Sequence, residues 1–497
     1  MNRSKAEPYD RSKTTGSDFL QLDPRQAPAG GLSDWLAGRL RLAMADGRLP
    51  VGARLPATRV LAGELGVSRG VITEAYRRLA EEGHVAGRGR AGTVVVGVPA
   101  TPPPLGGTSR PLGPSPVTAP SRLFAGEPRL DVFDALRAAP ARIDLSPGLP
   151  DLAAFPRAAW LRAERSVLTH LAAADLGYGD PRGAPALRTA VAHWLARNRG
   201  IRADPGEVIV VSGTAQALGL LARVFGEEGI QEVAVEEPGS LGARQHLNDA
   251  GVRTPPVTVD AEGVRVDELR ALGSPAVLLT PAHQFPAGVV LGGRRRRALL
   301  DWAREGGLVV EDDYDAEHRY DRTPVPALRS VLAERVCYAG SVSKLLAPAL
   351  RVGWLLAPRR FVDALVEAKR FADLGNAVLP QLVLAALMEG GELERHLRLL
   401  RTRHRRRRDA MIEAIGRRLP GAVVHGAAAG LHLMVTYEAG PADTDLAADA
   451  LARGVKVQPL SWHTQRPGPQ GLVMGYAART PAEIGEGVAI LGDLLRP

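Results

Sequence analysis

The 497-residue sequence has a single cysteine, Cys337, and no apolar run that approaches the roughly 18 residues needed to cross a membrane. One cysteine excludes an internal disulfide framework and favours a reducing compartment. Cys337 lies in the apolar run 335–339, which predicts a buried structural thiol. The basic N-terminal segment is not followed by an apolar block, so it is not typical of a secretory signal. We therefore expect a cytoplasmic protein that does not contact the membrane.

Lysine is also scarce, because only five of the 63 basic residues are lysines. Chemistry that requires a primary amine therefore has few candidates, since an arginine guanidinium stays protonated and does not condense usefully with an aldehyde. The histidines and the cysteine show no metal-ligand spacing, so no metal site is predicted. The net charge of +9 permits a nucleic-acid partner. Residues 31–97 concentrate this charge, with ten Arg against six Asp or Glu.

The length indicates several domains, and the first structured one is expected after a disordered leader of residues 1–30. Apolar residues recur at helical spacing over 32–46, a second short helix is predicted from Thr58, and a third follows Ser68, which is placed to cap it. Two strand-like runs, 84–86 and 93–96, flank a Gly- and Arg-rich loop. Residues 31–97 are therefore predicted to form three helices and a β-hairpin wing.

The rest of the chain has a different pattern. Residues 98–140 are rich in Pro, Gly, Ala and Ser and are predicted to be a linker. From 141 to about 360, apolar strand-like runs alternate with helical stretches, which is typical of an α/β domain with a mainly parallel sheet. From about 375 to 497, helices precede short strands, which predicts a smaller α+β subdomain. The arginine run 401–408 is expected to be a solvated helix face.

The three helices and the wing suggest a reader of DNA. In a helix-turn-helix, the second helix of the motif enters the major groove, where its N-terminal residues meet base edges and arginines hold phosphates. In this sequence Arg69, Thr73 and Arg77 are placed for that role. A helical domain used only for dimerisation is the alternative, but it does not explain an arginine-tipped wing.

Residues 47–95 resemble the GntR family of winged-helix regulators over nearly their whole length. The resemblance implies double-stranded operator DNA as the partner. It implies DNA contacts from the start of the second helix, from the recognition helix and from the wing tip, namely Arg59, Arg69, Thr73, Arg88 and Gly89.

Three motifs in the α/β domain each follow a predicted strand. Lys344 lies in GSVSKLLAPALRVGW, with Ser341 and Ser343 before it and Arg351 seven residues after it. Hydroxyl groups and a guanidinium that can form two parallel hydrogen bonds suit a phosphate dianion. In SGTAQAL, a strand leads into a helix, so the residues at its start can bind phosphate at the helix N-terminus, namely Thr214 and Ala215. Ser212 either joins them or merely ends its strand.

The third motif, LVVEDDY, ends a strand with Asp312 and Tyr314. Pyridoxal 5'-phosphate (PLP) requires an amine, an acid beside its pyridine nitrogen, a donor to its phenolic oxygen and a phosphate cradle. The carboxyl of Asp312 suits the nitrogen, the phenol of Tyr314 suits the oxygen, and Lys344 is the amine. The three motifs together predict a PLP site.

Residues 141–497 resemble the fold-type I, class I aminotransferases in LSPGLPDLAAFP, YGDPRGAPALRTAVAHWLARNRG, VEEPGSLGARQHL, TPAHQFPAGVVL and EDDYDAEHRY. With the GntR-like segment, the whole chain resembles the MocR/GabR regulators. The resemblance implies an internal aldimine at Lys344, Asp312 as the partner of the pyridinium, Tyr314 on O3', and Arg351 with Ser341 on the phosphate. It also implies a homodimer, in which Tyr178 reaches the phosphate bound by the partner subunit.

Three positions depart from the aminotransferase pattern. Ser240 replaces an aromatic ring that stacks on the cofactor, Phe285 replaces an asparagine directed at O3', and Val473 replaces the arginine that grips a substrate carboxylate, with Arg479 offset by six residues. These departures favour a transcription regulator that senses PLP or an amine or amino-acid effector. An active aminotransferase with an appended DNA-binding domain, and a purely structural dimerisation module, are the alternatives.

Overall fold

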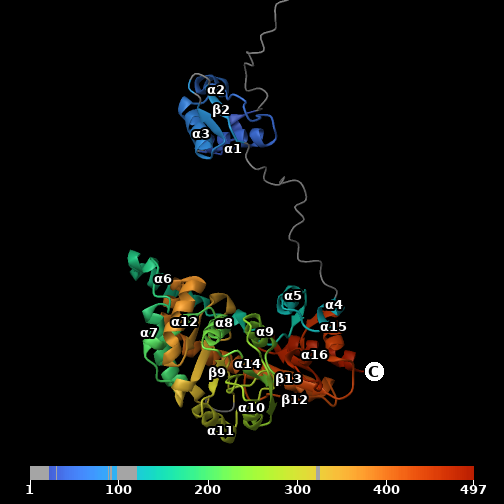
Figure 1. Ribbon diagram of the computed structural model, residues 1–497. Coiled ribbons are helices and arrows are strands. Elements are labelled where there is room, and N and C mark those ends of the chain that lie inside the picture. Colours follow the sequence, from blue (N-terminus) through green and yellow to red (C-terminus); the bar gives the residue numbers. More distant parts are fainter. Residues whose placement is uncertain are drawn as a thin grey trace, which may run out of the picture. The chain divides into compact units, whose positions relative to one another are not determined.

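The computed structural model describes residues 22–28, 31–87, 89, 92–97, 120–320 and 325–496. The chain divides between residues 116 and 117 into two compact units, here called unit 1 and unit 2 (Figure 1). Arg88, most of the predicted leader and residues 98–119 of the predicted linker lie outside the described residues. Within the described ranges, no helix combines the length and the apolar character that a membrane span requires.

Unit 1 has the predicted three helices and hairpin. Apolar side chains on one side of each helix meet in a single core, to which the hairpin adds Val85 and Val95. Gly66 ends the second helix in the left-handed conformation at φ 65°, which glycine adopts without steric cost. The predicted winged helix-turn-helix is thus confirmed, with elements α1 (Leu32–Ala45), α2 (Thr58–Leu65), α3 (Arg69–Glu81), β1 (Val85–Gly87) and β2 (Thr93–Val95).

Two local predictions for unit 1 differ from the structure. Ser68 occupies the N-cap position of α3, but its side chain makes no capping hydrogen bond. The leader was expected to be disordered as far as residue 30. Residues 24–26 instead form a 3-10 turn capped by the Asp23 carboxylate, and Leu22 packs against the core of unit 1. The short apolar cluster that contains Leu22 is too brief to give the periodic signal that would predict this contact.

Unit 2 is built on a sheet that has, within the described residues, eight strands in the order β4-β11-β10-β9-β8-β5-β6-β7. Strands β10, β9, β8, β5 and β6 are parallel, whereas β11 and β7 are antiparallel to their neighbours. The mainly parallel sheet is therefore as predicted. The bounds are β4 (Ile209–Val211), β5 (Ala234–Glu237), β6 (Pro256–Asp260), β7 (Gly263–Val264), β8 (Ala276–Leu279), β9 (Leu308–Asp313), β10 (Val336–Ser341) and β11 (Gly353–Leu356).

Helices cover this sheet, and the strands between them are buried, which explains their continuous apolar sequences (Figure 1). Cys337 lies in β10, is fully buried as predicted, and burial raises the pKa of its thiol to about 12. The helices are α6 (Arg157–His170), α7 (Pro185–Arg199), α8 (Thr214–Glu227), α9 (Leu241–Asp249), α10 (Val266–Leu272), α11 (Gly293–Arg304), α12 (Arg359–Asp373) and α13 (Val378–Glu389).

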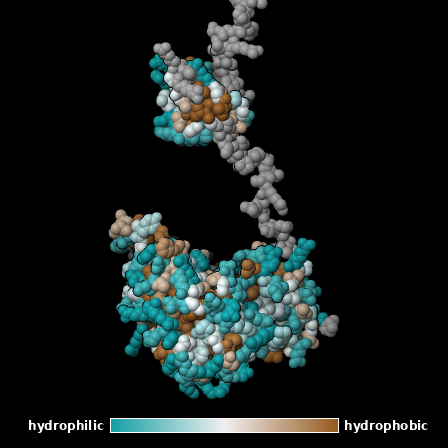
Figure 2. Space-filling model, viewed as in Figure 1, coloured by the Kyte–Doolittle hydropathy of each residue, from teal (hydrophilic) through white to brown (hydrophobic). Residues whose placement is uncertain are grey.

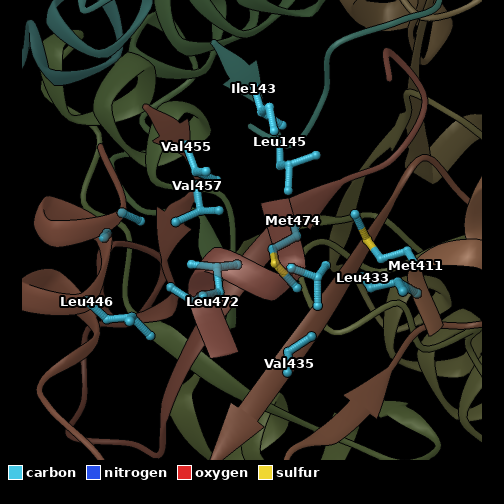
Figure 3. Packing of buried hydrophobic residues seen from close by; sticks show 14 of the residues in the cluster. Ile143, Leu145, Met411, Leu433, Val435, Leu446, Val455, Val457, Leu472 and Met474 are labelled. Carbon is cyan, nitrogen blue, oxygen red and sulfur yellow. The ribbon is translucent and has the colours of Figure 1, made fainter. Parts of the chain in front are cut away.

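A smaller α+β part contains a second sheet with the order β12-β13-β16-β15, together with the pair β14 and β3. Its core joins residues from both ends of unit 2, as Figure 3 shows for Ile143 and Leu145 beside Val455 and Val457. The elements are β3 (Ile143–Asp144), β12 (Val423–His425), β13 (His432–Tyr437), β14 (Val455–Lys456), β15 (Gln458–Pro459), β16 (Gln470–Gly475), α14 (Glu392–Arg418), α15 (Asp443–Ala452) and α16 (Pro481–Leu495).

The extent of this small subdomain differs from the predicted 375–497. Helix α13 packs in the same cluster as α7, under the large sheet, whereas the core of the small subdomain takes in residues 124–145. The predicted linker of 98–140 is correspondingly too long. Residues 120–124 and 132–138 form helices α4 (Pro120–Phe124) and α5 (Val132–Ala138), which bury their apolar side chains against Trp462. Short helices in a Pro- and Ala-rich segment leave too few turns for a periodic pattern to be recognised.

The arginine run 401–408 is not the solvated face that the sequence suggested. Arg403 Nε and Arg407 Nη1 donate hydrogen bonds to the buried Asp151 carboxylate at 2.7 and 2.8 Å. Arg407 is itself buried and also donates to the Ala477 carbonyl. A buried carboxylate persists when it is paired and hydrogen-bonded, so these arginines tie α14 to the loop that precedes α6.

Candidate cofactor site and DNA-binding surface

The site residues follow three strands that end at one edge of the large sheet. Because β11 runs antiparallel between β4 and β10, strands β4, β9 and β10 share one direction. Their carboxyl ends lead into the three predicted motifs, at the edge where open α/β sheets bind ligands. One cavity of about 670 Å³ lies there, and its lining includes Thr214, Ala215, Asp312, Tyr314, Ser341, Ser343, Lys344 and Arg351.

Lys344 is half-buried in this cavity. Its Nζ donates a hydrogen bond to the carbonyl of Gly148, which has φ 79°. A Cβ atom at Gly148 would lie 3.0 Å from Nζ, so glycine leaves room for the amine. Burial lowers the pKa of Lys344, and the carboxylates of Asp315 and Asp312 oppose the shift. A lowered pKa increases the neutral fraction of the amine, which is its nucleophilic form.

Asp312 and Tyr314 lie on the same wall, at the end of β9 and just after it. Burial raises the pKa of Asp312 to about 7, although it accepts a hydrogen bond from Thr214 Oγ1 at 3.3 Å. The Tyr314 hydroxyl donates to the carbonyl of His283 at 3.2 Å, and burial raises its pKa. The phenol therefore stays protonated and can donate to an oxygen anion, while the acid can ionise beside a positive charge.

A phosphate cradle forms where β4 enters α8. Gly213 precedes α8 at φ 92°, and a Cβ atom there would lie 3.7 Å from Arg351 Nη1 and 3.8 Å from Ser343 Oγ. Ser341 Oγ accepts a hydrogen bond from the Ser343 amide at 3.2 Å. Hydroxyl groups, a guanidinium and the N-terminus of a 14-residue helix thus face one space. This donor set suits a phosphate dianion.

An amine, a buried acid, a protonated phenol and a phosphate cradle around one cavity fit PLP. Tyr178, the remaining predicted cofactor contact, is 94% exposed and is not among the described residues that line the cavity of its own chain. Exposed leucines accompany it, and Figure 2 shows hydrophobic side chains at the projecting end of α6. The exposed leucines in this part of the sequence are Leu161 and Leu168 on α6 and Leu176 after it.

The three departures from the aminotransferase pattern have structural explanations. Ser240 caps α9, because its Oγ accepts from the Ala243 amide at 3.2 Å. Phe285 packs against His432 and His463, with ring centroids 4.9 and 5.0 Å apart. Both histidines line the cavity, and sequence reasoning did not select them because isolated histidines carry no spacing signal.

The position where aminotransferases carry the arginine that binds the substrate carboxylate holds Val473 in this chain. Val473 is fully buried in β16, between β13 and β15. Arg479 bonds to the Asp144 carbonyl at 3.3 Å and to Glu483 at 3.4 Å, and the described residues that line the cavity do not include it. A substrate carboxylate would therefore lack a bidentate partner at these two positions.

The titration of Asp312 gives a prediction for the cofactor-free protein. Because its pKa rises from about 3.8 when unfolded to about 7 when folded, folding binds a proton between these values. The free energy of unfolding should therefore fall as pH rises from about 4 to about 7 and level off above. Asp312→Asn removes this loss, so the variant should gain about 1–3 °C in Tm over wild type at pH 8, with a smaller gain at pH 5.

Thermal unfolding of both cofactor-free proteins across this pH range tests the prediction. Glu236 and Glu311 also have pKa values raised to about 7 by burial. The difference between variant and wild type cancels the contribution of Glu311, and from Glu236 it keeps only the part that arises because the charge of Asp312 raises its pKa. Melting curves that shift in parallel at every pH would show that Asp312 does not titrate in this window.

On unit 1, the predicted DNA contacts fall into two groups. Arg59, Arg69 and Thr73 are exposed on α2 and α3, and Arg69 Nε donates to Thr58 Oγ1 at 3.3 Å. Arg77 is exposed but is already paired with Glu74 at 2.7 Å and with Glu81. At the wing, Gly89 is exposed at φ 56°, and its neighbour Arg88 lies outside the described residues.

Comparison with known proteins agrees with this division into two units. Residues 32–95 match the model for bacterial regulatory proteins of the gntR family, and residues 142–491 match the model for aminotransferase class I and II. The probable rhizopine catabolism regulatory protein MocR of Rhizobium meliloti is 32% identical over 460 residues, which cover 90% of this chain and 91% of that protein. The chain belongs to the MocR-type GntR regulators.

Other relatives of this MocR-type regulator support the same family assignment. The pyridoxine biosynthesis regulator PdxR of Corynebacterium glutamicum is 30% identical over 463 residues, covering 92% of this chain and 94% of that protein. Among solved structures, the multiple substrate aminotransferase of Thermococcus profundus has a TM-score of 0.68 at 28% identity, covering 76% of this chain and 96% of that one. The MocR-type chain is thus a transcription regulator that joins a DNA-binding domain to a domain of a PLP-dependent family.

Proposed function

We propose that this regulator binds operator DNA through unit 1 and holds PLP at Lys344 in unit 2. PLP, or an amine or amino-acid effector that reaches the same cavity, then changes the affinity for DNA. The observation that carries the proposal is the convergence of Lys344, Asp312, Tyr314 and the phosphate cradle on one cavity in a chain with a GntR-type domain.

The residues around the cavity have separate tasks. When bound, PLP supplies an aldehyde that condenses with primary amines and a pyridine ring that withdraws electrons. Lys344 supplies the amine of the protein, and Asp312 in its ionised form holds a proton on the ring nitrogen. Tyr314 donates to the phenolic oxygen. The cradle, made of Thr214, Ala215, Ser341, Ser343 and Arg351, binds the phosphate.

Two features support communication beyond the cavity. Helix α5 lines the cavity with Phe133, Leu136 and Arg137, and α4 and α5 are the helices of unit 2 that follow the linker most closely in sequence. A ligand that moves α5 therefore acts on the segment that leads to unit 1. The exposed Tyr178 and the exposed leucines that precede it in the sequence support a homodimer in which Tyr178 reaches the phosphate in the partner subunit.

DNA binding by the purified protein to the region upstream of its own gene tests the proposal, with and without PLP. Wild-type affinity is expected to change with PLP, because the cofactor alters the state that binds DNA. Lys344→Ala should bind the same DNA but give no response to PLP. Identical PLP responses of the two proteins would contradict the proposal.

The same preparation addresses the alternative of an active aminotransferase. Turnover of an amino donor and an oxo acid at ordinary enzymatic rates, about 1 per second or faster, would favour an enzyme with an appended DNA-binding domain. The buried Val473 and the position of Arg479 away from the cavity lining speak against such turnover.

A further inference from the structure

Lys369 is a buried lysine that none of the roles above uses. It lies on α12, where its side chain is fully buried. Its Nζ lies 2.7 and 2.6 Å from the two carboxylate oxygens of Asp373 and donates to Asn376 Oδ1 at 2.7 Å. A buried ammonium is stable only when it is paired and hydrogen-bonded, and here three oxygens surround it. Lys369 therefore holds the loop 373–376, at the end of α12, in one arrangement.

The same loop bonds to both sides of the phosphate cradle. Asn376 Nδ2 donates to Ser212 Oγ at 2.8 Å and to the Arg351 carbonyl at 3.1 Å. Gln216 links the loop to the cradle a second time, because its Nε2 donates to Asp373 at 2.7 Å and its Oε1 accepts from the Ser212 amide at 2.8 Å. Helices α12 and α8, which carry Asp373 and Gln216, lie side by side (Figure 1).

The backbone at the cradle needs such support. Arg351 has φ 52°, in the left-handed region that residues other than glycine rarely adopt. Leu374, inside the loop, has φ 58°. Such conformations persist when surrounding contacts fix them, and the bond from Asn376 to the Arg351 carbonyl is one of these contacts.

We propose that Lys369, Asp373 and Asn376 are positioning residues that hold the Ser212 turn and Arg351 in the geometry that binds the phosphate of PLP. The inference rests on the proposed function, because it concerns the same cofactor. It assigns a role to three residues outside the cradle, one of which is a second lysine. Since these residues act on the phosphate alone, they should matter for PLP and not for pyridoxal, which lacks the phosphate.

The test compares two ligands on the full-length, cofactor-free protein. Binding of PLP and of pyridoxal is measured by absorbance titration for wild type, Asn376→Ala and Lys369→Met. Asn376→Ala should weaken PLP about tenfold, the loss expected when hydrogen bonds that orient a charged group are removed, and should leave pyridoxal within about twofold. The control is Glu227→Gln, which removes an exposed ion pair with Arg223 at the far end of α8 and should change neither affinity.

Inorganic phosphate gives a second readout that does not involve the aldehyde. Phosphate should raise the Tm of wild type more than that of Asn376→Ala, because a ligand stabilises the form that binds it better. Lys369→Met removes the ammonium that pairs with the Asp373 carboxylate, and it is interpreted only if its melting curve shows a folded protein. Asn376→Ala, at a half-buried position, keeps the inference testable if Lys369→Met does not fold.

The outcomes separate this inference from the proposed function. Equal weakening of PLP and pyridoxal in Asn376→Ala, or no change in either, would overturn the positioning role while PLP binding by wild type stands. If wild type binds PLP no better than Lys344→Ala does, the proposed function fails before any positioning variant is considered, and this inference fails with it.

Discussion

Lys344→Ala should lose at least about 100-fold in affinity for PLP, which corresponds to about 2.7 kcal/mol. The expected loss is large because the variant lacks the amine that bonds to the cofactor, and the phosphate cradle and Asp312 then hold PLP without a covalent link. Burial lowers the pKa of Lys344, so a larger fraction of this amine is in the neutral, nucleophilic form than in an exposed lysine.

Reduction with borohydride followed by peptide mapping checks this result directly, because it makes the link between protein and PLP permanent. The label should appear on the peptide that contains Lys344. Lys456 is the matched lysine, since it borders the same cavity, but its Nζ lies 3.5 Å from Asp144 and donates to the Arg137 carbonyl. Lys456→Met should keep the label, and equal labelling of Lys344→Ala and wild type would refute the assignment.

The sequence was sufficient for features that are local in the chain. Asp312, Thr214 and Lys344 could each be placed because an apolar strand directly precedes each motif, and parallel strands end at a common edge. The recognition helix and the wing could likewise be predicted from periodicity and turn residues. In these segments the pattern that determines the local structure lies within a few residues of the functional group.

Features that depend on distant contacts could not be predicted. Asn376 meets Ser212 across 164 positions in sequence, and neither residue has a pattern that points to the other. The arginines of α14 looked like a solvated face because their partner, Asp151, lies 252 positions from Arg403. Phe124, Val132 and Leu136 pack in the core of the small subdomain, so this subdomain begins with residues that composition assigned to a linker. Only the fold brings these groups together.

Arg69→Ala is expected to weaken binding to specific DNA by about 1–3 kcal/mol, which is roughly 5- to 150-fold. Arg69 is the first residue of the recognition helix α3 and is exposed, and its guanidinium donates a long hydrogen bond of 3.3 Å to the Thr58 hydroxyl. Its guanidinium therefore needs little reorganisation before it meets a base edge or a phosphate. Fluorescence anisotropy with the upstream DNA fragment measures the loss.

Arg77→Ala is the matched comparison on the same helix and should cost less than about threefold. Glu74 and Glu81 already pair with the Arg77 guanidinium, so DNA would have to displace two carboxylates before it could contact this arginine. Removal of the Arg77 side chain makes the local charge more negative but does not remove an unpaired cation. If Arg69 contacts a phosphate, its variant should also lower the salt dependence of binding by about one counterion. Losses of similar size in the two variants would indicate a general electrostatic attraction and would argue against a specific role for the N-terminal end of α3.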